Sequence, residues 1–434
     1  MRPPAVDTAT GATDTGRHAP RPQSAPAEPA APAEGLLAVR AHCAFDGERT
    51  LPGGALVLCR DGRIIGMESA TCAPPAGWQL HDYPDATILP GLVDCHVHLC
   101  GDSRNGALDR LPGLTDDELD AIIDRSLADQ LAAGVTTVRD LGDRHWAVVD
   151  RRDRLAHESP ARCPTIVAAG PPITTHQGHC WHMGGAAERS DEIRAAVRER
   201  ADRRVDIVKV MASGGAMTAG TDVLTCQYRL GQLRLVVDES HAAGLPVTAH
   251  AHGLPAVRQA LAAGVDGIEH CSCLTEHGID LPESVLRHLA ESRIVVCPTL
   301  GRRPDVTLPP GVLAVLQKTG TTWEARQELA VRLCHAGVDV VSGVDAGISD
   351  GKAHGILALA VADLVVGGAD VTTALATATS RAARACGLSD RKGALRTGYD
   401  ADLLVVDGDV TVDIRALQRI RAVYLHGTLA ATTR

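Results

Sequence analysis

Four segments of this 434-residue chain repeat one pattern, which restricts the possible folds more than any other feature. Each segment has an amphipathic helical stretch, an Ala-Gly pair, a short β-prone run and a closing polar residue. The Ala-Gly pairs begin at Ala133, Ala243, Ala263 and Ala336, and the closing residues are Asp140, His250, His270 and Asp345. Glycine suits the left-handed position at which a helix ends. The repeat therefore predicts helices that alternate with strands, and a polar side chain at the end of each strand.

Strands that alternate with helices are typical of a parallel sheet with crossover helices. The β-prone runs lie at 87–95, 135–140, 164–169, 206–211, 246–251, 266–270, 294–297 and 338–344. Eight such strands predict an α/β fold, a closed (β/α)8 TIM-like barrel that spans residues 87–394. In this fold the chemistry takes place at the C-terminal ends of the strands. The polar residues of this chain fall at those ends.

The two flanks of the predicted barrel have a different pattern. Residues 35–86 and 395–434 contain short apolar runs that are separated by Asp-Gly and Gly-Gly turns. They predict one small β-sandwich domain formed by both chain flanks. Residues 1–34 are rich in Ala and Pro and contain no apolar stretch of the signal-peptide kind, which predicts a disordered tail.

Composition excludes several classes of partner. The net charge of −10 disfavours nucleic acids and acidic membrane surfaces, because both bind basic proteins. No run of 18 or more apolar residues occurs in the sequence, so we expect no transmembrane helix. The 13 cysteines are scattered, which favours reduced thiols in a cytoplasmic protein. We expect a small-molecule substrate and allow for a homo-oligomer.

Two histidines end the apolar run that starts at Leu89. His96 and His98 are two residues apart, and such residues point to the same side of a strand. Both rings can therefore bind one divalent metal ion. The pair alone is weak evidence, because about one His-x-His is expected by chance in a chain with 19 histidines. Further candidate ligands at later strand ends give the pair its weight.

Lys209 lies inside the apolar strand predicted over 206–211 and is one of only four lysines. Burial lowers the pKa of a lysine and makes its neutral amine accessible. A neutral amine can react with CO2 to form a carbamate, an anionic oxygen ligand that bridges two metals. An ordinary ion pair would be the commoner explanation for an isolated lysine. Beside the histidines, we prefer the carbamate.

Three further residues end predicted strands. His250 and His270 follow identical Ala-Gly leads at the same offset, which is better explained by one shared site than by two unrelated core histidines. His252 could compete with His250 for the ligand role, but we expect it to orient the metal ligands without binding the metal itself. Asp345 ends the eighth strand, where a carboxylate can bind a metal and accept a proton.

The six residues together predict a site for two divalent metal ions, with Zn²⁺ preferred over Mn²⁺, Co²⁺ or Fe²⁺. We expect one metal on His96, His98 and Asp345. The other metal would be held by His250 and His270. A carbamate on Lys209 and a hydroxide would bridge the two ions.

With these motifs the chain resembles the amidohydrolase superfamily of metal-dependent hydrolases, over nearly everything after residue 35. The resemblance includes the run from Leu89 to His98, the strand-four lysine, the later histidines, the final Asp and the closing segment 398–408. Within the superfamily, segments 178–185, 207–215 and 227–228 resemble the branch of imidazolonepropionase-like proteins and bacterial Xaa-Pro or Xaa-Arg dipeptidases.

The resemblance also implies residues that bind the substrate. In the dipeptidases, a His after strand three and a Tyr after strand four bind the terminal carboxylate of the substrate, and the matching positions are His179 and Tyr228. His176 and Arg229 flank these positions and are further candidates. Arg229 would pair with a substrate carboxylate.

The implied activity is that of an enzyme that cleaves an amide, a dipeptide-like C–N bond, with a metal-activated hydroxide. Asp345 would act as general base and then as general acid. The alternatives are hydrolysis of a cyclic amide or lactone, and deamination of a small heterocycle. Deaminases of this superfamily carry a Glu three residues after the strand-five His, where this chain has Gly253. A non-catalytic binding protein, the third hypothesis, would have lost part of the six-residue set.

Overall fold

The Ala-Gly pairs mark the ends of helices, as the repeat predicts. Gly134, Gly244, Gly264 and Gly337 all have left-handed backbones, with φ between 76° and 82°. The helix before each glycine and the strand after it are α2 (Asp116–Ala132) and β7 (Val135–Asp140), α5 (Leu230–Ala242) and β10 (Val247–Gly253), α6 (Leu254–Ala263) and β11 (Gly267–Thr275), and α9 (Trp323–His335) and β14 (Asp339–Val340). Four helix-to-strand turns therefore have the same conformation for the same reason.

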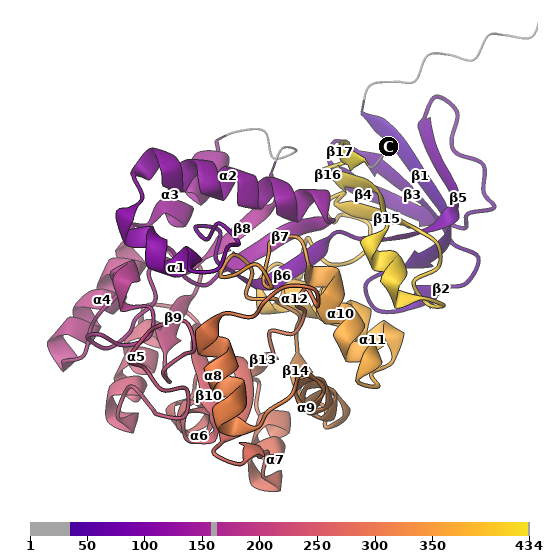
Figure 1. Cartoon of the computed structure of the whole chain (residues 1–434). Helices are drawn as coiled ribbons and strands as arrows, with labels where there is room; N and C mark the ends of the chain where they lie inside the picture. Colours follow the sequence, from indigo (N-terminus) through magenta and orange to yellow (C-terminus); the bar gives the residue numbers. More distant parts are fainter. Residues whose placement is uncertain (1–34, 158–162, 433–434) are drawn as a thin grey trace, which may run out of the picture.

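The computed structural model describes residues 35–157 and 163–432, and the predicted tail over 1–34 lies outside them. Its parallel strands form two groups (Figure 1). The first has the order β6 (Leu92–Val97), β7 and β8 (Thr165–Ala168); the second has β9 (Val208–Met211), β10, β11, β13 (Val295–Cys297) and β14, with β12 (Gly278–Ile279) antiparallel to β11. The architecture is α/β and of the TIM-barrel class.

Backbone hydrogen bonds join the two groups of strands at both sides. The amide of Asp206, just before β9, donates to the carbonyl of Ala168 in β8 over 2.9 Å. On the other side, Cys95 of β6 donates to Ser342 over 3.0 Å, and Asp345 donates to His96 over 2.8 Å. These bonds connect the two groups, while closure of the barrel stays a prediction.

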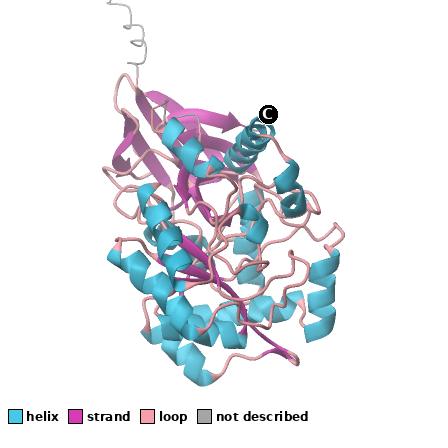
Figure 2. Ribbon diagram, turned by 90° about the vertical axis from the view of Figure 1, so that its left-hand side faces the viewer, coloured by secondary structure: helices cyan, strands magenta, loops and turns pink. Residues whose placement is uncertain are grey.

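Helices surround the strands on the outside (Figure 2). Besides those already named, they are α1 (Ala107–Arg110), α3 (Ala147–Leu155), α4 (Ser190–Asp202), α7 (Glu283–Glu291), α8 (Pro310–Thr319), α10 (Leu357–Val366), α11 (Val371–Thr377) and α12 (Ser380–Ala385), with 3-10 turns at Leu111–Gly113, Trp181–Met183 and Ile414–Gln418. Within the described residues, none of the helices has both the length and the apolar character needed to cross a membrane.

Both flanks of the chain contribute strands to a second, eight-stranded sheet. These strands are β1 (Leu36–Phe45), β2 (Thr50–Leu51), β3 (Ala55–Arg60), β4 (Arg63–Glu68), β5 (Gln79–Pro90), β15 (Leu403–Asp407), β16 (Ile420–Leu425) and β17 (Thr428–Thr432). Antiparallel pairing of β15 with β5 joins the flanks, with Leu404 opposite Leu89. The second layer that a β-sandwich requires stays a prediction.

The single strand predicted over 87–95 is two strands in the structure. β5 ends at Pro90 in the eight-stranded sheet, and β6 starts the barrel at Leu92. Gly91 lies between them, where a Cβ atom would be 2.2 Å from Oγ1 of Thr136. A continuous apolar run hides this change of sheet, because both strands are buried.

The turn at Gly134 is also a contact between barrel and small sheet, since a Cβ there would lie 2.7 Å from Cδ1 of Leu404. Gly244 has a similar φ with no heavy atom that close.

We expect Gly244→Ala to lower the free energy of unfolding by about 1 kcal/mol through backbone strain alone. Gly134→Ala adds steric overlap and should cost roughly 3 kcal/mol. If urea denaturation showed the same loss of unfolding free energy in both variants, the contact between Gly134 and Leu404 would be contradicted.

Candidate metal centre

The histidines of β6 lie beside Asp345. Nε2 of His96 and Nε2 of His98 are 3.3 Å and 3.1 Å from Oδ1 of Asp345. Burial alone would raise the pKa of Asp345, but the charges of His96 and His98 lower it below its ordinary value. Asp345 has a left-handed backbone, with φ of 62°. Such strain in a residue other than glycine concentrates at functional sites.

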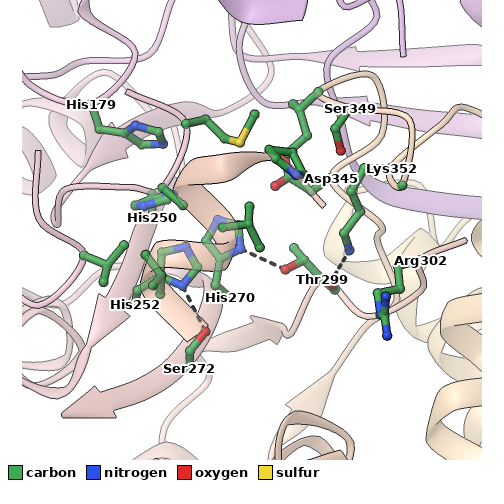
Figure 3. A pocket seen from close by; sticks show the side chains of 18 of the residues that line it. His179, His250, His252, His270, Ser272, Thr299, Arg302, Asp345, Ser349 and Lys352 are labelled. Atoms are coloured by element: carbon green, nitrogen blue, oxygen red, sulfur yellow. Dashed lines mark hydrogen bonds between the residues drawn. The ribbon is translucent and has the colours of Figure 1, made fainter. Parts of the chain in front are cut away.

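Three more imidazoles gather on the neighbouring strands β10 and β11. The ring of His270 lies 4.5 Å from that of His250 and stacks on that of His252 at 4.2 Å, centroid to centroid (Figure 3). One nitrogen of each ring lies within 4.8 Å of the others, as ligands of one ion do. His270 forms a second such group with His96 and Asp345. The two sets of candidate ligands therefore adjoin each other.

Burial keeps these imidazoles neutral. It lowers the pKa of His252 to about 3, and it lowers the pKa of His250 and of His270 well below the ordinary value. The Nδ1 atoms of two of these rings have hydrogen-bond partners, because Nδ1 of His270 lies 2.8 Å from Oγ1 of Thr299 and Nδ1 of His252 lies 3.0 Å from Oγ of Ser272. A hydrogen bond to one ring nitrogen fixes the tautomer and leaves the other free to bind metal.

Lys209 of β9 faces the same cavity. It is only 1% exposed, and its Nζ has no hydrogen-bond partner. Burial lowers its pKa, although Glu269 and Asp345 act in the opposite direction. A buried and unpaired amine is costly unless it is neutral or modified. This orphaned nitrogen fits the carbamate that the sequence predicts.

Glu269 is a member of the site that the sequence analysis did not single out. Its carboxylate accepts hydrogen bonds from Arg139 at 3.0 Å and Thr248 at 2.6 Å, and it lies 2.8 Å from Nδ1 of His96. Adjacent strand residues normally point to opposite faces. His270 has φ of 66°, which breaks the alternation after Glu269. The feature of the sequence that could have indicated Glu269 is an acidic residue inside an otherwise apolar strand.

The structure also brings His179 to the cavity. This residue follows β8, is 5% exposed, and has its ring centroid 4.6 Å from that of His250. Nδ1 of His179 lies 2.9 Å from Oγ1 of Thr218. Burial lowers the pKa of His179 to about 3. Its ring is therefore neutral and positioned beside the candidate ligands.

The structure places the other three predicted substrate-binding residues elsewhere. His176, Tyr228 and Arg229 lie around a separate surface depression next to Glu192. The Tyr228 hydroxyl donates to the carbonyl of Ala187 over 2.7 Å, and His176 lies 3.3 Å from the Glu192 carboxylate. None of the three lines the cavity that contains His179.

The cavity itself has a volume of about 200 Å³, and residues of α8 form part of its lining. The six predicted metal ligands and His252 all line it. Among the described residues of this lining, Asp345 is the only carboxylate. Nitrogen donors together with one carboxylate match the ligands of Zn²⁺ and similar ions.

A parallel α/β arrangement with imidazoles and a carboxylate at the C-terminal ends of its strands defines a candidate metal-dependent enzyme. The family model of the amidohydrolase family matches residues 87–430. The chain belongs to this family, which confirms the resemblance drawn from its motifs. Amidohydrolases hydrolyse carbon–nitrogen bonds and generally use divalent metal ions.

Similar proteins support this assignment. Ochratoxinase of Aspergillus niger is 26% identical over 365 residues, which cover 77% of this chain and 73% of that protein. Imidazolonepropionase of Salinispora tropica is 27% identical over 394 residues, or 84% of this chain and 88% of the relative. A crystal structure of a Xaa-Pro dipeptidase with bound methionine has a TM-score of 0.80 at 23% identity, covering 92% of this chain and all of that one. The last likeness concerns the fold.

Removal of the Glu269 charge tests how the site is held together. In Glu269→Gln, the buried Arg139 loses its counter-ion, and we expect the free energy of unfolding to fall by roughly 3 kcal/mol. The hold on His96 also weakens, so metal affinity should fall roughly 10- to 100-fold. Chelator competition measures the second effect. The exposed Glu276, changed to Gln as a control, should alter neither quantity.

Proposed function

We propose that this amidohydrolase is a binuclear metal enzyme that cleaves an amide, a dipeptide-like C–N bond. His96, His98 and Asp345 would hold one ion, with Zn²⁺ the metal of choice. His250 and His270 would hold the other. The closed barrel and the β-sandwich remain parts of the same proposal.

The observation that carries this proposal is the unpaired Nζ of Lys209 within the buried group of imidazoles. A neutral amine there can attack CO2, form an N–C bond and release one proton, which leaves an anionic carbamate. That charge would be matched by the cations that His96 and His250 help to bind. Without modification, the structure gives this nitrogen no partner.

When bound, the metals would lower the pKa of water and polarise the amide carbonyl. Asp345 lies at the site with its carboxylate ionised, so it can accept the proton of the attacking water. It can then return this proton to the leaving nitrogen. The neutral ring of His179 can hydrogen-bond the substrate on the other side of the cavity.

Hydrolysis of a cyclic amide or lactone would use the same residues and stays an alternative. Deamination is less well supported. The position that would carry the acid of a deaminase is Gly253, where a Cβ would lie 2.9 Å from the backbone of Leu224. Neither an acid nor space for one exists there.

Metal analysis of Lys209→Ala tests the proposal. In protein prepared with bicarbonate, we expect about two metal ions per chain, and a sharp fall in metal content and amide hydrolysis in the variant. Dipeptides with C-terminal Pro or Arg and cyclic amides would be the first substrates. Lys318→Ala, which changes an exposed lysine paired with Asp222, is the control. One metal that is retained without Lys209 would exclude the binuclear site.

A further inference from the structure

Three cationic side chains surround one tryptophan on the wall of the cavity. The guanidinium carbons of Arg302 and Arg326 each lie 5.1 Å from the ring centroid of Trp323, and Nζ of Lys352 lies 5.3 Å from it. All four residues line the cavity that holds the candidate metal ligands. The two arginines give this side of the cavity a positive charge, whereas burial lowers the pKa of Lys352 to about 7.

No carboxylate within the described residues forms an ion pair with any of these three cations. Lys352 donates to the carbonyls of Thr299 and Gly301 at 2.8 Å each, and Arg326 donates to Pro298 at 3.0 Å. Arg302 is half-buried and makes no described hydrogen bond of its own. Its guanidinium is therefore the donor group that remains available to a ligand.

Two acids of helices α9 and α10 lie close enough for their charge to reach this wall. The exposed Glu324 has its pKa lowered by hydrogen bonds and in part by the charge of Arg302 but forms no ion pair with it, and Asp363 is engaged by other groups. The carboxylate of Asp363 accepts hydrogen bonds from Trp323 at 3.2 Å, from Gln327 at 2.6 Å and from the amide of Gly301 at 2.8 Å. Partly buried cations without a counter-ion are costly, and a bound anion would compensate them. A planar carboxylate matches the fork of an arginine.

The position of this wall relates it to the metal centre. Oγ1 of Thr299 lies 2.8 Å from Nδ1 of His270, and its carbonyl accepts from Lys352 (Figure 3). One residue thus connects a metal ligand with the cationic group. In an N-acyl amino acid, only the amide nitrogen and Cα separate the scissile carbonyl from the carboxylate, so both groups have to be bound within one cavity.

The described lining of the cavity offers no free carboxylate to pair with an ammonium ion. Asp345 is the only carboxylate in the described lining, and it is held by His96 and His98. Another part of the lining is apolar, with Leu308, Val312, Val315 and Leu316 of α8 and the loop before it. A hydrocarbon chain can pack there, whereas a free α-ammonium group would lack a counter-ion.

We infer that Arg302 binds a carboxylate of the substrate, and that the substrate is an N-acyl amino acid with an apolar acyl group rather than a free dipeptide. This inference rests on the proposed amide hydrolysis and specifies its substrate class. Arg302 determines specificity in it, and Trp323 and Lys352 are neighbours that shape the subsite.

Three probes separate the elements of this inference. N-hexanoyl-L-leucine has both the carboxylate and the apolar acyl group. N-(3-methylbutyl)hexanamide is the same amide without the carboxylate, and L-norleucyl-L-leucine adds an α-ammonium to the acyl group. Hydrolysis of each is measured with the metal-loaded protein and with its Arg302→Gln variant. Arg303→Gln is the control, because Arg303 is exposed on the same loop and does not line the cavity.

We expect kcat/KM to be highest for N-hexanoyl-L-leucine. Arg302→Gln should lower it roughly 10- to 100-fold, mostly through KM, since a charged hydrogen bond to the bound substrate is lost. The same variant should leave the decarboxylated amide unchanged, and Arg303→Gln should change neither. A wild-type protein that hydrolyses all three compounds equally, or an Arg302→Gln effect of equal size on each, would overturn the inference while leaving the proposed hydrolysis intact.

If the wild-type protein cleaves none of the probes, calorimetric measurement of their binding tests whether the carboxylate subsite exists. Tighter binding of N-hexanoyl-L-leucine that is lost in Arg302→Gln would support the subsite and count against the proposed reaction. Equal binding of all three probes, or none, would overturn the subsite. A thermal melt of each variant confirms that the protein is folded.

Discussion

The buried carboxylate of Glu269 is the interaction on which the site depends. It lies on β11 and contacts Arg139 of β7, Thr248 of β10 and His96 of β6. These strands belong to both groups of the parallel sheet. An ion pair at this depth stabilises little by itself, but loss of either partner leaves an uncompensated charge. The network therefore fixes how the strands are placed relative to one another more than it adds stability.

The same network also determines the chemistry of the neighbouring groups. Because Nδ1 of His96 faces Glu269, the Nε2 atom is directed to Asp345 and to the metal centre. Lys209 lies in the field of Glu269 without a direct bond to it, which leaves its nitrogen free. One carboxylate thus orients a ligand on one strand while another strand presents an unpaired amine.

Much of the architecture could be predicted from the sequence, because the glycine after each helix has a conformational requirement that few other residues meet. The His96 and His98 pair and the strand-end residues were also predictable, since period-two alternation places them on one face. Glu269 was not, because the left-handed backbone of His270 breaks that alternation. Arg302 was not, because the residues around it come from a loop, α9 and the segment after β14, which no local pattern relates.

The single-residue connection at Gly91 has a consequence for the order in which the chain can fold. β5 continues through Gly91 into β6, the strand that carries His96. One edge of β5 pairs with β1, and within the described residues the other edge pairs with β15. During synthesis, that edge stays unpaired until residues 403–407 have left the ribosome, and an open edge invites association with other chains. A strand made late in synthesis thus covers one made early, and the nascent chain is exposed to association with other chains until residues 403–407 have been made.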